Sequence, residues 1–158
     1  MIRPLAPQDR DNIHRLLLET HTFNEMEISV AMEVLDTCIG SGDESGYMIL
    51  CHDGAAGEIT GYICFGAVPL TDYSYDIYWI AVAPASSRKG LGAALLSEME
   101  KIVAARGGTR IYLDTSSTAP YEKARCFYEK FGYRRLSVLP DFYRKGDDKI
   151  IYMKEIVP

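Results

Sequence analysis

The sequence predicts an α/β domain in which helices lie on the faces of a sheet. The chain has 158 residues, the size of one ordinary domain, so we expect a single domain over residues 1–158. Hydrophobic residues make up 47% and charged residues 25%, which is typical of a globular protein and excludes wholesale disorder. The spacing of the apolar residues switches repeatedly between the helical period and the strand period, which indicates mixed structure.

The first half of the chain predicts one short strand, two helices and three longer strands. The short strand covers residues 2–5, and Pro7 lies near the start of the first helix, which carries Ile13, Leu16, Leu17 and Leu18. The second helix repeats apolar residues at helical spacing and ends at glycines 40 and 42; its apolar residues are Met26, Val30, Val34, Leu35 and Ile39. Strands are predicted over residues 47–52, 59–68 and 75–82.

The second half predicts two helices and three strands. A long helix carries one apolar face, made of Leu91, Leu95, Met99, Ile102 and Val103. After it we expect a short strand over residues 111–113, a helix over 121–131 and strands over 133–139 and 149–156. The order is therefore β-α-α-β-β-β-α-β-α-β-β, with seven strands and four helices.

Charge and composition exclude several classes of function. The net charge of −5 argues against a general affinity for nucleic acid and suits a cationic partner such as an amine. The longest apolar stretch, residues 77–85, is far shorter than a membrane span, and the N-terminus has no signal-peptide pattern. The four cysteines form no CxxC pair and no metal-ligand spacing, so we expect no metal and a reducing, cytoplasmic location. We expect Cys126 to be a packed thiol rather than a nucleophile.

The segment Ser87-Arg88-Lys89-Gly90-Leu91-Gly92-Ala93 follows a predicted strand and opens a helix. Unpaired N–H groups and the helix dipole favour an anion there, and glycines let a phosphate approach the backbone. The segment lacks the P-loop pattern, and Leu95 stands where a dinucleotide fingerprint needs glycine. Two interpretations stay open: a pyrophosphate-binding site, or a turn in which glycine only makes the backbone more flexible.

A second motif is the helical segment Ala124-Arg125-Cys126-Phe127-Tyr128-Glu129-Lys130-Phe131-Gly132-Tyr133. Its aromatic residues are spaced for packing, and Gly132 is suited to end the helix. On its own the pattern makes Tyr128 a core residue. Together with the first motif it makes Tyr128 a catalytic candidate.

In this order and separation the two motifs resemble those of the GNAT (Gcn5-related) N-acetyltransferase superfamily. The stretch Ile80-Ala81-Val82-Ala83-Pro84 leads into the glycine motif as in the family, and the resemblance extends from Ile2 to Ile156. Two positions depart from the pattern: Ser87 replaces the leading Gln or Arg, and Tyr121 replaces an Asn. The stretch Leu113-Asp114-Thr115-Ser116-Ser117 resembles a subgroup with an LxTS segment.

The resemblance implies a GNAT-like fold, with a mixed, mostly antiparallel sheet splayed between its fourth and fifth strands. It implies acetyl-CoA as co-substrate. The residues that would bind it are Ile80, Ala81 and Val82 for pantetheine, Arg88, Lys89, Gly90, Leu91, Gly92 and Ala93 for the pyrophosphate, and Tyr121. Tyr128 would protonate the leaving thiolate, which is reasonable because a phenol and a thiol have similar pKa values.

The acceptor amine needs a base. With a pKa of about 10.4, an alkylamine is neutral in roughly one molecule per thousand at neutral pH. Asp76 and Asp114 are the two candidates, and the sequence leaves open both the choice between them and an ordinary surface role for each. Asp72, Glu25 and Asp141 are further acidic residues suited to an acceptor pocket.

The sequence therefore predicts an acetyl-CoA-dependent N-acetyltransferase that acts on a primary amine of a small molecule or a peptide N-terminus. Two alternatives remain. Ser87 and Tyr121 motivate an acyl-CoA-binding regulatory module without turnover, and the other alternative is a protein lysine or N-terminal acetyltransferase. A closed pocket lined by Tyr73, Tyr75 and Tyr143 would favour a small acceptor. A homodimer is expected by analogy only.

Overall fold

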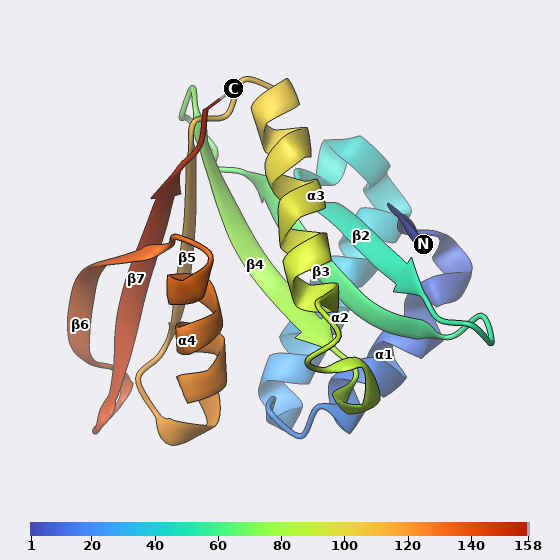
Figure 1. Ribbon diagram of the computed structural model, residues 1–158, viewed down its shortest axis with the longest axis horizontal. Coiled ribbons are helices and arrows are strands. Elements are labelled where there is room, and N and C mark those ends of the chain that lie inside the picture. The colour runs from blue at the N-terminus through green and yellow to red at the C-terminus, as the bar shows by residue number, and fades with distance from the viewer. Residues whose placement is uncertain (158) are drawn as a thin grey trace. The chain divides into compact units, whose positions relative to one another are not determined.

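The structure is a computed structural model, which describes residues 1–157 and contains seven strands and four α-helices (Figure 1). This confirms the predicted order of elements. The bounds are β1 Ile2–Pro4, α1 Arg10–Glu19, α2 Glu25–Ser41, β2 Met48–Asp53, β3 Ile59–Ala67, β4 Ser74–Val82, α3 Leu91–Ala105, β5 Arg110–Ser116, α4 Glu122–Lys130, β6 Arg134–Arg144 and β7 Asp147–Glu155.

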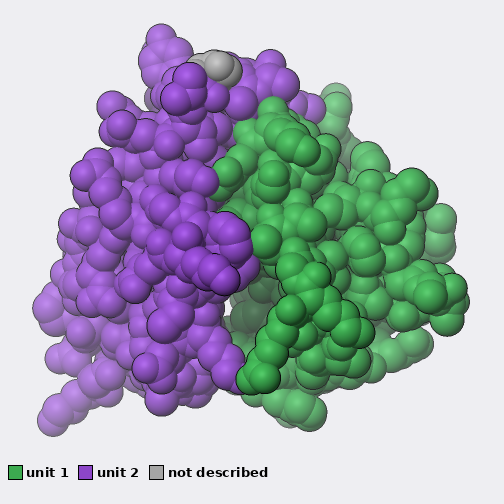
Figure 2. Space-filling model, in the orientation of Figure 1, with its two compact units in different colours: residues 1–67, 77–102 green, residues 68–76, 103–158 purple. Residues whose placement is uncertain are grey.

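The strands form a mixed sheet in the order β1-β2-β3-β4-β5-β7-β6. β1, β2 and β3 pair antiparallel, as do β5, β7 and β6, whereas β4 pairs parallel with β5. This confirms the α/β class and the mostly antiparallel sheet. The ladder between β4 and β5 consists of residues 74–76 and 110–112, a short pairing that agrees with the predicted splay. The chain divides into two compact units, coloured separately in Figure 2.

Unit 1 comprises residues 1–67 and 77–102 and contains a core between helices and sheet. α1 and α2 lie on one face of β2 and β3, and α3 lies on the other face (Figure 1). A Cβ atom at Gly61 of β3 would lie 3.1–3.2 Å from side-chain atoms of Leu91 and Leu95, so glycine permits the close approach of α3. The core on the α1/α2 side includes Ile13, Leu16, Leu17, Ile28, Ala31, Met32, Leu35, Tyr62 and Cys64.

The predicted apolar face of α2 is partly wrong. Met26 and Val30 are 77% and 43% exposed, whereas the helix buries Ile28, Ala31, Met32 and Leu35. Apolar residues occur on more than one side of this helix, so their spacing alone does not select the buried side. Contacts with α1 and the sheet decide it. The start of α2 is fixed locally, since Asn24 and Glu27 form a reciprocal capping box.

An ion cluster connects β1 and the end of β2 to the turn that precedes α1. The Arg3 guanidinium donates to Asp9 at 2.7 and 2.9 Å and to Asp53 at 2.7 and 2.9 Å. The Asp9 side chain is 4% exposed and also accepts the N–H of Ala6 at 2.8 Å. Hydrogen bonds from Arg3 lower the pKa of Asp9 below its usual value, so this buried carboxylate stays ionised.

Unit 2 comprises residues 68–76 and the described residues from 103 to 157. Its helix α4 lies over one face of β5 and β7 (Figure 1), and its core includes Tyr128, Tyr133 and Tyr152. At Gly108 a Cβ atom would lie 2.7 Å from the Tyr75 ring, so glycine permits this buried aromatic to pack against the turn after α3.

The β6–β7 hairpin is longer than predicted. The sequence predicts strands over 133–139 and 149–156, but β6 continues to Arg144 and β7 begins at Asp147. Pro140 and Asp141 are typical of loops, and here the register shift between Leu139 and Arg144 accommodates them, with Asp141 at a φ of 52°. The Asp141 carboxylate accepts the N–H of Gly146 at 2.7 Å, which stabilises the turn.

The LxTS segment anchors β5 to the start of β7. The Ser116 hydroxyl donates to the buried Asp147 carboxylate, and the Asp148 N–H donates to the Ser117 hydroxyl at 2.9 Å. The Arg125 guanidinium of α4 donates to the carbonyl groups of Ser116 and Thr118 at 2.8 and 2.9 Å. The serines of this segment therefore have a structural role, two and three residues after Asp114.

Candidate active site

The predicted anion site is a tight turn that leads into α3, within unit 1. The N–H groups of Ser86 and Ser87 donate to the Ala83 carbonyl at 2.8 and 2.9 Å. The Ala94 N–H donates to the Gly90 carbonyl at 3.0 Å, so α3 begins directly after Gly90 and the N–H groups of residues 91–93 precede the helical ladder. These donors and the helix dipole suit a pyrophosphate. The Lys89 N–H donates to the Ser86 carbonyl at 3.3 Å within the turn.

Backbone conformation in this turn is unusual at two residues. Arg88 and Gly90 have φ angles of 73° and 77°, in the left-handed region. Glycine adopts this region freely, but a side chain there costs about 1–2 kcal/mol. Such strain occurs often at binding sites, and Arg88 is one of the residues predicted to bind the pyrophosphate.

We expect Arg88→Gly to stabilise the protein by about 0.5–1 kcal/mol, because relief of the left-handed strain exceeds the entropy cost of glycine. The same change should weaken binding of coenzyme A, since the guanidinium is lost. Urea denaturation and calorimetry measure the two effects. Arg88→Lys is the matched control, which retains both strain and charge. Unchanged coenzyme A affinity in Arg88→Gly would remove Arg88 from the phosphate site.

The end of β4 carries the predicted pantetheine residues. Ala81 is buried in the core of unit 1, and Ile80 and Val82 are half-buried. Next to them, the indole N–H of Trp79 is buried and has no hydrogen-bond partner in the described part of the chain. The Trp79 ring lies 6.4 Å from that of Phe23. Trp79 was not among the predicted site residues, although it is the single tryptophan of the chain and directly precedes Ile80.

Tyr128 lies in α4, within unit 2, and Tyr121 is the N-cap residue of that helix. The Tyr128 ring contacts Phe127 and Tyr133 edge-on, with centroids 5.5 and 5.8 Å away, and lies 6.4 Å from Tyr152. Burial raises the pKa of the Tyr128 phenol. The group therefore stays protonated at neutral pH, in the form that can donate a proton.

The two candidate bases lie together on one face of the sheet, within unit 2. Asp76 of β4 is opposite Tyr112 of β5, and Asp114 of β5 is opposite Ile151 of β7. Since side chains alternate along a strand, Asp76 and Asp114 project from the same face. Tyr152, opposite Leu113, projects from the other face and contacts Tyr128. The structure therefore places the carboxylates on the face opposite the Tyr128 ring.

Asp114 has two partners in this unit. Its Oδ2 accepts the Tyr143 hydroxyl at 3.0 Å and lies 3.7 Å from Lys149 Nζ. Asp76 is half-buried, and burial, followed by the Asp114 charge, raises its pKa, while Lys149 lowers it. Lys149 was not among the predicted site residues. Asp76 is thus a stronger base than an ordinary aspartate, and Asp114 is held by a hydroxyl and an ammonium.

Several other predicted residues lie elsewhere. Cys126 is exposed, so its prediction as a packed thiol is wrong; α4 buries its other side, where Tyr128 lies. Asp141 stabilises the β6–β7 turn, and Asp72 is exposed before β4. Tyr73 is 59% exposed and Tyr75 belongs to the core, whereas Tyr143 is 41% exposed and is the one of the three that contacts Asp114.

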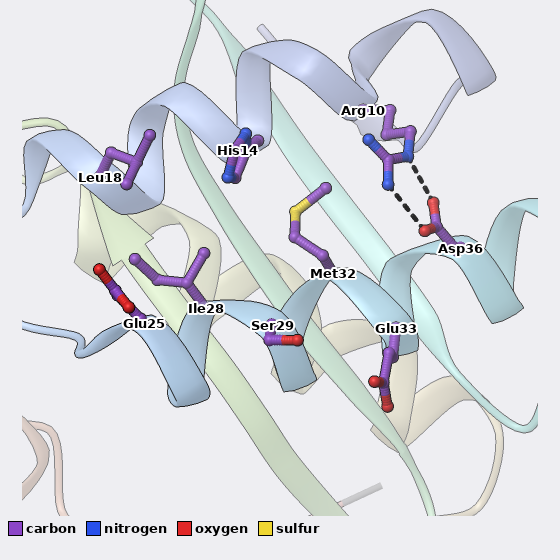
Figure 3. A pocket seen from close by; sticks show the side chains of 9 residues that line it. All are labelled: Arg10, His14, Leu18, Glu25, Ile28, Ser29, Met32, Glu33 and Asp36. Carbon is purple, nitrogen blue, oxygen red and sulfur yellow. Dashed lines mark hydrogen bonds and ion pairs between the residues drawn. The ribbon is translucent and has the colours of Figure 1, made fainter.

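Glu25 lines a groove of about 450 Å³ between α1 and α2 of unit 1 (Figure 3). Its apolar residues are Leu18, Ile28 and Met32, and Arg10 donates to Asp36 at its edge. Glu25 is the one predicted site residue among the residues of the groove. The predicted catalytic and cofactor-binding residues therefore lie outside this groove.

Among residues 1–157 no group of three or more His, Cys, Asp or Glu side chains is placed to hold a metal ion. None of the described helices combines the length and hydrophobicity that crossing a membrane requires.

A model of the acetyltransferase (GNAT) family matches residues 10–133, which include both sequence motifs. The chain belongs to the GNAT family. This GNAT protein is 38% identical to a protein from Desulfovibrio desulfuricans that is assigned to the GNAT acetyltransferases, with a TM-score of 0.92 and 98% of each chain covered. The GNAT family uses acetyl-CoA as co-substrate, so the chain is an N-acetyltransferase with acetyl-CoA as its acetyl donor.

More distant structures share the GNAT fold. An aminoglycoside 6'-N-acetyltransferase complexed with coenzyme A has 22% identity and a TM-score of 0.75, with 100% of this chain and 98% of that chain covered. The ribosomal-protein-S18-alanine N-acetyltransferase from Escherichia coli has 20% identity and a TM-score of 0.79, with 100% and 94% covered. Among curated protein sequences no significant match was found.

Proposed function

We propose that this GNAT enzyme acetylates a primary amine of a small molecule or of a peptide N-terminus, with Asp76 as the general base and Tyr128 as the acid. The amine nitrogen attacks the thioester carbonyl, and the C–S bond breaks as the tetrahedral intermediate collapses. Asp76 accepts the ammonium proton from its face of the sheet, and the Tyr128 hydroxyl protonates the leaving sulfur from the opposite face. The observation that carries this proposal is the pair of Asp76 and Asp114, in which Asp76 has a raised pKa.

Asp76 suits the role of base better than Asp114. A carboxylate with a raised pKa binds a proton more strongly, which reduces the mismatch with an amine of pKa about 10.4. Asp114 is already bound by Tyr143 and Lys149. We assign to Asp114 the attraction of the incoming ammonium group and to Asp76 the removal of its proton.

On the cofactor side, the open N–H groups of residues 91–93 and the charges of Arg88 and Lys89 support binding of the pyrophosphate. The backbone of Ile80, Ala81 and Val82 is assigned to pantetheine, and Tyr121 to a neighbouring contact. We also propose that residues 1–158 act as one N-acetyltransferase domain. A cytoplasmic location and a homodimer remain predictions from the sequence.

The test is release of free thiol from acetyl-CoA in the presence of an amine panel. The panel includes an aminoglycoside and a peptide with an N-terminal alanine, because two proteins that share this fold are named as acetyltransferases of these kinds of acceptor. It also includes a peptide with an internal lysine, whose selective acetylation would indicate the protein-modifying alternative. Coenzyme A binding by calorimetry without thiol release from any acceptor would support the regulatory module and contradict the proposal.

We expect Tyr128→Phe to lower kcat by about 10²–10⁴-fold, because the ring and its packing remain while the proton donor is lost. Coenzyme A affinity should stay at the wild-type value. Tyr152→Phe is the matched control, since its ring also lies in this aromatic cluster and its hydroxyl donates to Glu129 at 2.9 Å. Equal kcat in Tyr128→Phe and wild type would exclude Tyr128 as the acid.

A further inference from the structure

Lys149 of β7 lies among residues from two neighbouring strands. Its Nζ is 3.7 Å from Asp114 Oδ2 of β5 and 4.5 Å from the centroid of the Phe142 ring of β6. The Lys149 side chain is 24% exposed, so it is largely removed from solvent. An ammonium group between a carboxylate and an aromatic face is attracted by both.

The strand register explains why Lys149 reaches this place. Lys149 precedes Ile151 by two residues, and Ile151 is opposite Asp114, so both β7 side chains project from the face that carries the two aspartates. Two aspartates close together repel each other when both are ionised. Lys149 is the cation near this pair in the described part of unit 2, and it lowers the pKa of Asp76 against burial and Asp114, which raise it.

The other titratable groups on this face are two tyrosines and the side chains of Arg110, Arg134, Arg144, Asp147 and Glu155. Tyr143 of β6 donates its hydroxyl to Asp114, and Tyr112 of β5 is opposite Asp76. A phenol carries no charge near neutral pH. Of the charged groups on this face, Lys149 forms the ion pair with Asp114, so the balance of charge at the pair depends most directly on Lys149.

We propose that Lys149 is a positioning residue of the acceptor site, whose ammonium group holds the Asp114 carboxylate and offsets the negative charge that Asp76 and Asp114 share. This extends the proposed function, because Asp76 is the base there. With Lys149 in place, Asp76 is available as an ionised base at lower pH than burial beside Asp114 alone would allow.

The test is a carbon-13 NMR titration of the aspartate carboxyl groups in the full chain without ligand, with the Asp76 signal assigned from the Asp76→Asn spectrum. In Lys149→Met the Asp76 midpoint should rise by about one pH unit, a tenfold increase in proton affinity. Lys149→Gln should show the same shift, which guards against failure of one variant to fold. Lys149→Arg should titrate close to wild type.

Lys154→Met is the matched control, because Lys154 lies on β7 with its Nζ 5.5 Å from the centroid of the Tyr133 ring, on the other face of the strand. It should leave the Asp76 midpoint unchanged. An unchanged midpoint in folded Lys149→Met and Lys149→Gln overturns the proposal. This titration needs no acceptor, so its outcome is separate from the success of the acetylation test. Where an acceptor is found, the acid limb of kcat/KM should move to higher pH in Lys149→Met and Lys149→Gln but not in Lys149→Arg or Lys154→Met.

Discussion

Asp76→Asn is expected to reduce kcat/KM for acetyl transfer by about 10²–10⁴-fold at neutral pH, since the amide is nearly isosteric but cannot accept the proton. Binding of coenzyme A should persist. A thiol-release assay with a responsive acceptor measures the first effect and calorimetry the second. Asp43→Asn, which changes an exposed carboxylate before β2, is the control. A larger loss in Asp114→Asn than in Asp76→Asn would reverse the assignment of the base.

The free energy of unfolding of Asp76→Asn distinguishes a loss of catalysis from a loss of the folded structure. The pKa of Asp76 is raised in the folded protein, so between the unfolded and folded pKa values the unfolded chain binds fewer protons. Stability contributed by this group therefore falls as pH rises through that window. The variant lacks this penalty and should be slightly more stable than wild type at neutral pH. Wild-type kcat/KM in a folded Asp76→Asn protein would contradict the proposed base.

Arg3→Met is expected to lower the free energy of unfolding by about 3–5 kcal/mol, the cost of leaving a buried charge without its partner. The variant leaves Asp9 buried with one backbone N–H donor and leaves Asp53 without the guanidinium. Since domains are stable by about 5–15 kcal/mol, this is a large share of the total. Urea denaturation at neutral pH provides the measurement.

The control is Arg10→Met. Arg10 also forms two hydrogen bonds to one carboxylate, that of Asp36, but both side chains are nearly half exposed. Its removal should cost no more than about 1 kcal/mol. Equal losses in the two arginine variants would show that burial of Asp9 does not determine the effect.

The pH dependence gives a second test of the Arg3 cluster. The pKa of Asp9 is lowered in the folded protein, so the stability from this group is present above the unfolded pKa, about 3.9. It is lost as pH falls through the lower folded pKa. The difference between wild type and Arg3→Met should therefore narrow at strongly acid pH. Arg3→Met combined with Asp9→Asn should recover part of the lost stability.

Local patterns predicted the order of elements because each strand and helix is marked by its own period and turn residues. They did not predict the buried side of α2, since Met26 and Ile28 are both apolar and contacts with α1 select between them. They also ended β6 early, because Pro140 suggests a loop and the bulge that accommodates it depends on pairing with β7.

The candidate site was predicted in part for the same reason. Asp76 and Asp114 each stand in a predicted strand or at its end, and the glycine turn is local in sequence. The contact of Lys149 with Asp114 depends on the antiparallel register of β5 and β7, which brings together residues 35 positions apart. No single-segment pattern carries that information.

The exposed position of Cys126 allows a fluorescent probe to be attached to α4. Burial raises the pKa of the Cys51 thiol to about 12 and also raises the pKa values of Cys38 and Cys64, which leaves these three thiols protonated and poorly reactive. Cys126 is exposed on α4, two residues before Tyr128. A maleimide dye should therefore label this helix selectively in the unaltered chain. The fluorescence of the dye can then follow the approach of acetyl-CoA in real time.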